Sequence, residues 1–196
     1  MTTVVSVRFR SGCKTYFFDP RELTVEAGRP DTITDDKLRT LRAHGVDRIS
    51  VNPQTMSDEV LNVIGRRHTA ADIVEALEKA RKVGGMEVNM DLIAGLPADS
   101  AEGFEKTLDT VIALDPENIT VHTLSLKKGS RITLEGSAIP SDAEVGKMLD
   151  IAQDKLRRGG WAPYYLYRQK FMSGGFENVG WAKDGRVCLL YTSPSP

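Results

Sequence analysis

The sequence predicts an α/β protein, an open or partial β/α barrel built on a parallel sheet. Short runs rich in β-branched residues alternate along most of the chain with amphipathic stretches at helical spacing. Strands that alternate with helices are joined by right-handed crossovers, so neighbouring strands run parallel. With 196 residues, of which 40% are hydrophobic and 27% charged, the chain has the length and composition of one soluble globular domain.

The bounds of each expected helix and strand follow from the residues at which its hydrophobic pattern starts and stops. Helices are expected to begin near the residues that can cap them, and to end at glycines or before proline, as at Asp115-Pro116. Residues 141–144 have the pattern of a reciprocal capping box, whose helix reaches Arg158. Residues 52–55 are expected to form a loop. The expected strands cover 23–27, 46–51, 88–94, 119–126 and 164–167, and the expected helix starts are Thr34, Ser57, about Ala71, Ser100 and Ser141.

Charge and cysteine content exclude several classes of protein. A net charge of -1 argues against binding to nucleic acid or to a membrane surface, because both depend on a basic excess. No apolar run approaches the ~18 residues of a membrane span, and no secretory signal is visible, so we expect a cytoplasmic protein. Cys13 and Cys188 lie at opposite ends of the sequence and indicate neither a disulfide framework nor a cysteine metal site, and the three histidines have no ligand spacing. No metal ligand is predicted.

Polar residues follow or end several expected strands, which is where parallel α/β folds bind ligands. Asn89 and Asp91 alternate on one face of their strand. A buried carboxylate needs partners, which Arg66 or two ligand hydroxyls could supply to Asp91, and we favour a functional role for it. The full set of polar candidates is Glu26, Asn52, Gln54, Asn89, Asp91, His122 and Ser125.

Other residues have two interpretations each. Arg66 either complements the end of a helix or clamps a ligand carboxylate. Glu26 either binds a ligand amine or hydroxyl, or pairs with Arg29. Gln54 fits an ordinary solvated loop, and the tyrosines of 164–167 fit strand packing better than a stacking platform. From chemistry alone, the sequence predicts a barrel with a polar ligand site.

Several motifs, taken in order, resemble a known family. They are Leu23-Thr-Val-Glu26-Ala-Gly, Arg48-Ile-Ser-Val-Asn-Pro-Gln54, Ile64-Gly-Arg66-Arg-His68, Asn89-Met-Asp91-Leu-Ile-Ala-Gly-Leu-Pro97, Val121-His-Thr-Leu-Ser125 and Pro163-Tyr-Tyr-Leu-Tyr. Together they resemble the oxygen-independent coproporphyrinogen III oxidase family of radical S-adenosylmethionine (SAM) enzymes, and specifically its dehydrogenase-type branch. The resemblance covers about residues 23–187.

The resemblance implies a partial (β/α) barrel of radical SAM type, with a [4Fe–4S] cluster and SAM at its top. It implies that Glu26, Gln54, Arg66, Asp91 and Ser125 bind SAM: Arg66 its carboxylate, and Gln54 and Asp91 its ribose. In the family, the reduced cluster cleaves SAM to a radical that starts decarboxylation of porphyrinogen propionates to vinyl groups. The cofactors carry this chemistry, and no catalytic side chain is assigned.

This sequence departs from the family in one respect. The family's CxxxCxxC cluster motif lies upstream of the strand that contains Glu26, and the sequence has no such motif. A cluster needs several thiolates, so we expect the N-terminal strands of the barrel to be missing and this chain to be inactive by itself. Related alternatives are a haem chaperone or another radical SAM protein.

The two ends do not resemble this family. Residues 1–20 resemble the start of small bacterial regulators that join RNA-maturation and sporulation complexes, which leaves a regulatory or binding module as a different alternative. Residues 188–196 resemble a translated sequencing adapter. Simpler readings are an edge hairpin for the first segment and a frayed Pro/Ser terminus for the second. We expect three parts: a foreign segment 1–22, a partial barrel 23–187 and an artefactual tail 188–196.

Overall fold

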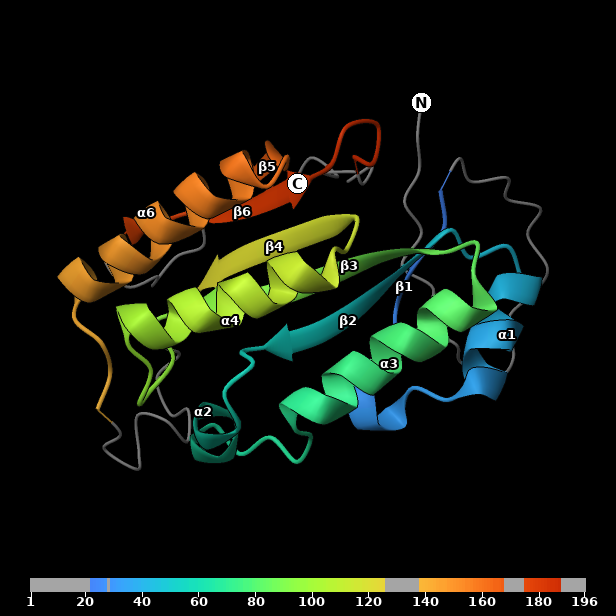
Figure 1. The fold of residues 1–196 in the computed structure, drawn as a ribbon, viewed down its shortest axis with the longest axis horizontal. Helices are drawn as coiled ribbons and strands as arrows, with labels where there is room; N and C mark the ends of the chain where they lie inside the picture. The colour runs from blue at the N-terminus through green and yellow to red at the C-terminus, as the bar shows by residue number, and fades with distance from the viewer. Residues whose placement is uncertain (1–21, 28, 126–137, 168–174, 188–196) are drawn as a thin grey trace, which may run out of the picture.

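The computed structural model describes residues 22–27, 29–125, 138–167 and 175–187 (Figure 1). The terminal segments with foreign resemblance therefore lie almost wholly outside the described residues. The strands are β1 (Thr24–Glu26), β2 (Arg48–Gln54), β3 (Glu87–Ala94), β4 (Asn118–Thr123), β5 (Ala162–Tyr167) and β6 (Asn178–Ala182). The helices are η1 (Pro30–Thr32), α1 (Asp35–Ala43), α2 (Asp58–Val63), α3 (Ala70–Val83), α4 (Ala101–Leu114) and α6 (Asp142–Arg158).

The strands form one six-stranded sheet in the order β1-β2-β3-β4-β6-β5. The first four are parallel, as the alternation of strands and helices predicts. The expectation of a parallel sheet fails for the last two strands of the order, because β6 is antiparallel to both β4 and β5. The sequence pattern missed β6, because five residues with a central glycine are a weak strand signal. The predicted strand 119–126 also ends earlier, at Thr123.

Helices cover one face of this sheet, and α1, α3, α4 and α6 lie in front of it in Figure 1. Side chains alternate along β3, so that Val88, Met90, Leu92 and Ala94 are buried while the residues between them are half-buried. The buried set packs with Leu77 and other helix residues into one core. The sheet therefore has a helix face that is apolar and an opposite face, here called the open face, that no described helix covers.

Helix starts match the expected caps. The hydroxyls of Thr34, Ser57, Ser100 and Ser141 each accept a hydrogen bond from a backbone N–H of the first turn. The reciprocal capping box, however, lies at Thr69 and Asp72 of α3 rather than at Ser141 and Glu144.

Glu144 joins two helices instead of closing its own. Its Oε1 accepts a hydrogen bond of 2.9 Å from the backbone N–H of Ala101, the first residue of α4. That hydrogen bond lowers the pKa of Glu144, because it favours the ionised carboxylate. The contact explains why the expected box fails: the neighbouring helix offers a better donor than the helix's own N-cap.

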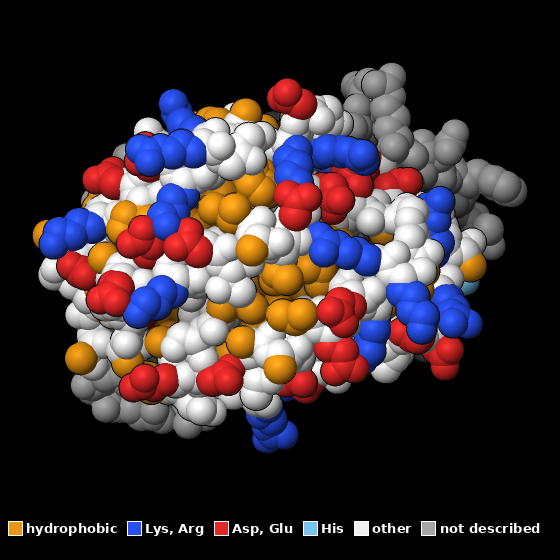
Figure 2. All heavy atoms as spheres, in the orientation of Figure 1, with side chains coloured by type: hydrophobic (Ala, Val, Ile, Leu, Met, Phe, Trp, Pro, Cys, Tyr) orange, Lys and Arg blue, Asp and Glu red, His pale blue; other side chains and the backbone are white. Residues whose placement is uncertain are grey.

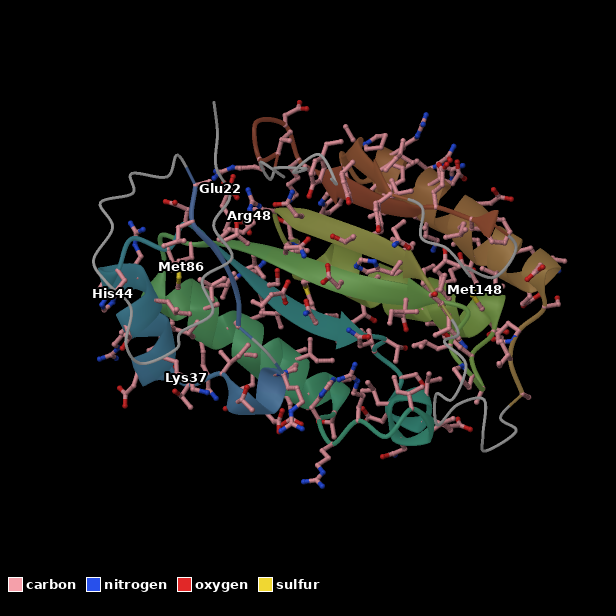
Figure 3. The ribbon with its side chains drawn as sticks, turned by 180° about the vertical axis from the view of Figure 1, so that it is seen from behind. Glu22, Lys37, His44, Arg48, Met86 and Met148 are labelled. Atoms are coloured by element: carbon pink, nitrogen blue, oxygen red, sulfur yellow. The ribbon has the colours of Figure 1, made fainter. Side chains whose placement is uncertain are left out.

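Gly95 fixes α6 against the end of β3. Its φ of +86° suits glycine, and a Cβ here would lie 3.0 Å from Val145 of α6. Its N–H donates to the sulfur of Met148 at 3.3 Å, and Figure 3 labels Met148 at this end of the sheet. The helix can approach the strand this closely only where the strand has no side chain.

A buried arginine ties the strands together at the opposite, amino-terminal edge. Arg48, at the start of β2, is 3% exposed. Its Nε donates to Glu22 at 2.8 Å and its Nη2 pairs with Glu87 of β3 (Figure 3). Arg186, which follows β6, pairs with the same Glu87 at 2.7 Å. This cluster joins the beginnings of three parallel strands to a segment far along the chain.

The outer surface of the helices is mixed in charge. Figure 2 shows Lys and Arg side chains interspersed with Asp and Glu across this face. Many of them form pairs within or between helices, as Lys155 does with Asp109 at 2.6 Å. In the part of the chain that the structure describes, no helix has both the length and the apolar character to cross a membrane.

Replacing Arg48 should destabilise the fold strongly. Arg48→Met leaves the carboxylates of Glu22 and Glu87 without their shared cation, so we expect the free energy of unfolding in urea to fall by about 3–5 kcal/mol. Arg158→Met removes only an exposed pair with Asp154 and should change it by less than about 0.5 kcal/mol. Similar losses in the two variants would contradict a special role for the buried cluster.

Candidate functional site

A network of polar side chains occupies the open face of β3 and β4. Asn89 donates to Asp91 Oδ1 at 2.7 Å, and the Thr120 hydroxyl donates to Asn89 Oδ1 at 3.0 Å. His122 Nε2 lies 3.7 Å from the same Asp91 oxygen. The parallel register places Asp91 beside Thr120, and strand alternation turns all four side chains to one side. The carboxylate of Asp91 is 16% exposed, so it is held by the protein and still open to a ligand.

Asp91 therefore finds its partners on the sheet. The sequence suggested Arg66 or ligand hydroxyls as partners for a buried carboxylate at this position. The structure shows Asn89 from the same strand and His122 from the next strand instead. Because Asn89 occupies only one oxygen, the carboxylate retains acceptor capacity for further donors.

Glu26 lies on the open face at the end of β1. Its Oε2 accepts a hydrogen bond of 2.8 Å from Asn52 of β2. The alternative that Glu26 pairs with Arg29 is wrong, because Arg29 pairs with Asp31 at 3.2 Å. Glu26 and Asp91 lie on strands separated by β2, which places them about 10 Å apart across the sheet.

Gln54 ends β2 in a strained conformation. The predicted loop over 52–55 is wrong in part, because β2 continues to Gln54. The pairing with β3 is irregular between Val51 and Gln54, and Gln54 has φ +69°. A non-glycine residue in this region costs of order 1–3 kcal/mol, and such strain concentrates at functional sites.

Arg66 and Ser125 lie beyond the carboxyl ends of their strands. Arg66 follows α2, which Figure 1 places next to the arrowhead of β2, and the φ of +72° at Gly65 ends that helix. The half-buried Arg66 side chain has no hydrogen-bond or ion-pair partner among the described residues. Ser125 lies two residues after β4 and is half-buried.

The structure thus distributes the five predicted residues over the open face and the carboxyl edge of the sheet. Asp91 and Glu26 are held by hydrogen bonds on the open face. Gln54 ends β2 at the carboxyl edge, and Arg66 and Ser125 follow their strands there. Thr120 was not among the sequence candidates. The sequence could have indicated it, because Thr120 lies two residues before His122 and therefore on the same face of the strand.

A cavity of about 560 Å³ opens at the opposite, amino-terminal edge. Most of its charged groups already pair with one another or with the backbone; Glu117, for example, accepts from the N–H of Val88 at 2.8 Å. We therefore assign this cavity to the structural ion cluster. No group of metal-binding side chains occurs within 22–27, 29–125, 138–167 and 175–187. The cavity is lined by Glu22, Asp47, Arg48, Gly85, Met86, Glu87, Glu117, Gly185, Arg186 and Val187.

Comparison with known proteins identifies the superfamily of the chain. Residues 17–111 match the radical SAM superfamily. The chain is 44% identical over 171 residues to the oxygen-independent coproporphyrinogen-III oxidase-like protein HemZ of Bacillus subtilis, covering 86% of this chain and 34% of that protein. It is 30% identical over 164 residues to the haem chaperone HemW of the same organism, covering 82% of this chain and 42% of the chaperone.

A solved structure shares the fold. Coproporphyrinogen III oxidase (HemN) from Escherichia coli, a radical SAM enzyme, superposes with a TM-score of 0.69 at 25% identity, covering 84% of this chain and 36% of the enzyme. The chain spans roughly a third of the length of HemZ and HemN. Sequence and fold together place this chain in the radical SAM superfamily, among the relatives of oxygen-independent coproporphyrinogen III oxidase.

Proposed function

We propose that this chain contributes the SAM-binding part of a radical SAM protein that acts on a porphyrinogen. The observation that carries the proposal is the polar network of the open face, centred on Asp91. The network lies on the open face within β3 and β4, and Gln54, Arg66 and Ser125 lie at or beyond the carboxyl ends of the strands, where α/β folds bind ligands. SAM supplies a sulfonium and an ammonium group, to which an acidic face is complementary.

The assignments follow from the chemistry of each side chain. Asp91 is proposed to accept hydrogen bonds from the ribose hydroxyls, with Asn89 holding the carboxylate in place. Arg66 is proposed to bind the carboxylate of the methionyl group, because its guanidinium can donate two parallel hydrogen bonds. Glu26 is proposed to bind the ammonium group. Gln54 and Ser125 are proposed to line the same site. In the whole protein, bound SAM would supply the radical chemistry, and these residues would orient it.

The [4Fe–4S] cluster of the family does not fit the residues of this chain in the same way. The sequence contains two cysteines, Cys13 and Cys188, and both lie outside the described residues. A site-differentiated cluster is held by three thiolates spaced closely enough to meet on one face of it. We therefore propose that this chain alone binds SAM without cleaving it, and we derive no step through the cluster.

Two functions remain for the whole protein. Similarity to HemZ and HemN supports oxidative decarboxylation of porphyrinogen propionates in haem biosynthesis, in the cytoplasm. Identity of 30% to HemW supports a haem chaperone as the second candidate. A protein that extends this chain by the CxxxCxxC segment would distinguish them: the first function predicts loss of carbon dioxide from coproporphyrinogen, and the second predicts haem transfer without it.

Removing the charge of Asp91 should weaken SAM binding. In isothermal titration calorimetry of the chain with SAM, we expect Asp91→Asn to raise Kd about tenfold or more, because a hydrogen bond to a charged group contributes about 1.5–3 kcal/mol. Glu78→Gln, on the exposed face of α3, should leave Kd unchanged. Equal affinity in the Asp91 variant would reject this assignment.

The geometry of the Arg66 side chain should matter as well as its charge. Arg66→Lys keeps a cation but cannot donate in a bidentate manner, so we expect at least a fivefold rise in the Kd of SAM. The adjacent and exposed Arg67 provides the control, because Arg67→Lys should bind SAM as the parent chain does. S-adenosylhomocysteine amide, which lacks the carboxylate, should bind Arg66→Lys and the parent chain equally.

Cluster reconstitution provides a separate test. After anaerobic incubation with iron and sulfide, followed by gel filtration, we expect the chain to retain far less than one cluster per molecule by iron analysis and by absorbance near 400 nm. A version with an added CxxxCxxC segment serves as the control and should retain a cluster. A full cluster in the chain as it stands would contradict our interpretation of its cysteines.

A further inference from the structure

Three tyrosines on β5 face the same side of the sheet as the polar network. The register pairs Tyr165 with Gly180 and Tyr167 with Asn178 of β6, and Gly180 pairs in turn with Thr120 of β4. Paired residues of neighbouring strands point to the same face, so Tyr165 and Tyr167 lie on the open face together with Thr120. One row across the sheet therefore runs from Asp91 through Thr120 and Gly180 to Tyr165.

An irregularity in β5 adds Tyr164 to this group. The pairing passes from Pro163 opposite Trp181 to Tyr165 opposite Gly180, so Tyr164 is an extra residue. A Cβ on Gly180 would lie 3.1 Å from two ring atoms of Tyr164 and 3.2 Å from its hydroxyl oxygen. The ring of Tyr164 thus lies over the backbone of Gly180. We name the group of Tyr164, Tyr165 and Tyr167 the tyrosine wall.

The tyrosine wall is not part of the core. None of the three residues belongs to the buried cluster formed by the described residues, and Tyr167 is 46% exposed. The rings of Tyr165 and Tyr167 are 6.3 Å apart between centroids and nearly parallel, at 7°. Burial raises the pKa of Tyr165, with a smaller contribution from the neighbouring Tyr167, and its protonated hydroxyl can donate a hydrogen bond at neutral pH. Tyr165 and Tyr167 thus present aromatic surface outside the core, which a ligand can contact.

The position of β5 brings this wall to the proposed site. Because β5 is antiparallel to β6, and β6 to β4, β5 runs in the same direction as β1–β4. Tyr167, at its end, therefore lies at the carboxyl edge, where Gln54 and Ser125 also lie. Between Asp91 and Tyr165 there are three strand intervals, or about 14 Å along the sheet. A nucleoside whose ribose is bound by Asp91 is shorter than this distance, so it would not fill the space between Asp91 and Tyr165.

We infer that the tyrosine wall binds the pyrrole rings of a tetrapyrrole, next to SAM on the open face of the sheet. This inference rests on the proposed function and specifies where its substrate lies. Pyrrole rings stack on phenol rings, and the tyrosine hydroxyls can donate to the carboxylates that the tetrapyrrole carries. Because Gly180 has no side chain, the ring of Tyr164 can lie over it, between the other two tyrosines and the polar network.

The test uses coproporphyrin III, an air-stable porphyrin with the same propionate groups, and the full chain. Binding is followed by quenching of the fluorescence of Trp161 and Trp181. We expect Tyr165→Ala to raise Kd about tenfold or more, as removal of a stacking aromatic residue does elsewhere. Tyr165→Phe, which keeps the ring, should stay within about threefold of the parent. Gly180→Ala, which displaces Tyr164, should also weaken binding.

Leu166→Ala is the matched control. Leu166 lies between two tyrosines of the wall, pairs with Val179 on the other face and is 62% exposed, so its variant should bind as the parent does. Urea unfolding of each variant shows that a loss of binding is not a loss of structure. Unchanged porphyrin affinity in Tyr165→Ala, or an equal loss in Leu166→Ala, overturns the inference.

Parallel titrations with SAM separate this inference from the proposed function. Tyr165→Ala should bind SAM normally, and Asp91→Asn should still bind the porphyrin. If SAM binding proves independent of Asp91 while porphyrin binding depends on Tyr165, the cofactor assignment fails and the tyrosine wall stands. If SAM binding depends on Asp91 and the porphyrin does not bind the parent chain, the wall fails and the cofactor assignment stands.

Discussion

The alternation of side chains across the sheet is the constraint on which the rest of the structure depends. On one side, Val88, Met90 and Leu92 of β3 pack under the helices; on the other, Asn89 and Asp91 form the polar network. A shift of one residue in register would exchange the two sets, burying a carboxylate under α4 and exposing the core. Because both outcomes cost several kcal/mol, the apolar face fixes the position of every polar group on the open face. The site is thus placed by residues that never touch a ligand.

The amino and carboxyl ends of the parallel strands, here called the amino and carboxyl edges of the sheet, have different functions. At the amino edge, Glu22, Arg48 and Glu87 pair closely and hold the strand starts together. At the carboxyl edge, the Arg66 side chain has no partner among the described residues, and Gln54 carries a strained backbone. Charged groups that pair with other protein groups stabilise the structure, whereas polar groups that can still form hydrogen bonds are suited to binding a ligand. This distinction explains why we do not place the function at the amino edge, although a cavity opens there.

Local signals predicted most of the elements, and long-range pairing accounts for the failures. Caps such as Thr34 and Ser100 act within one turn, so their sequence pattern was sufficient. The capping box predicted at Ser141 does not form, because Glu144 accepts a hydrogen bond from the start of α4, 43 residues earlier in the sequence. The alternation of Asn89 and Asp91 could be read from one strand, whereas the partner His122 required the register with β4. The tyrosines were expected to pack within a strand, since nothing local indicates that Tyr164 lies over Gly180, sixteen residues later.

The strand order has a consequence for how the chain folds. β6 lies between β4 and β5 in the sheet, although β5 comes first in the sequence. During synthesis, β5 therefore emerges before β6, the strand that lies between it and β4. It cannot join the sheet until β6 has paired with β4. Pairing between strands far apart in sequence is slow, so this edge should be the last part of the sheet to become protected from hydrogen exchange. A nascent chain would complete the polar network first and add the tyrosines afterwards.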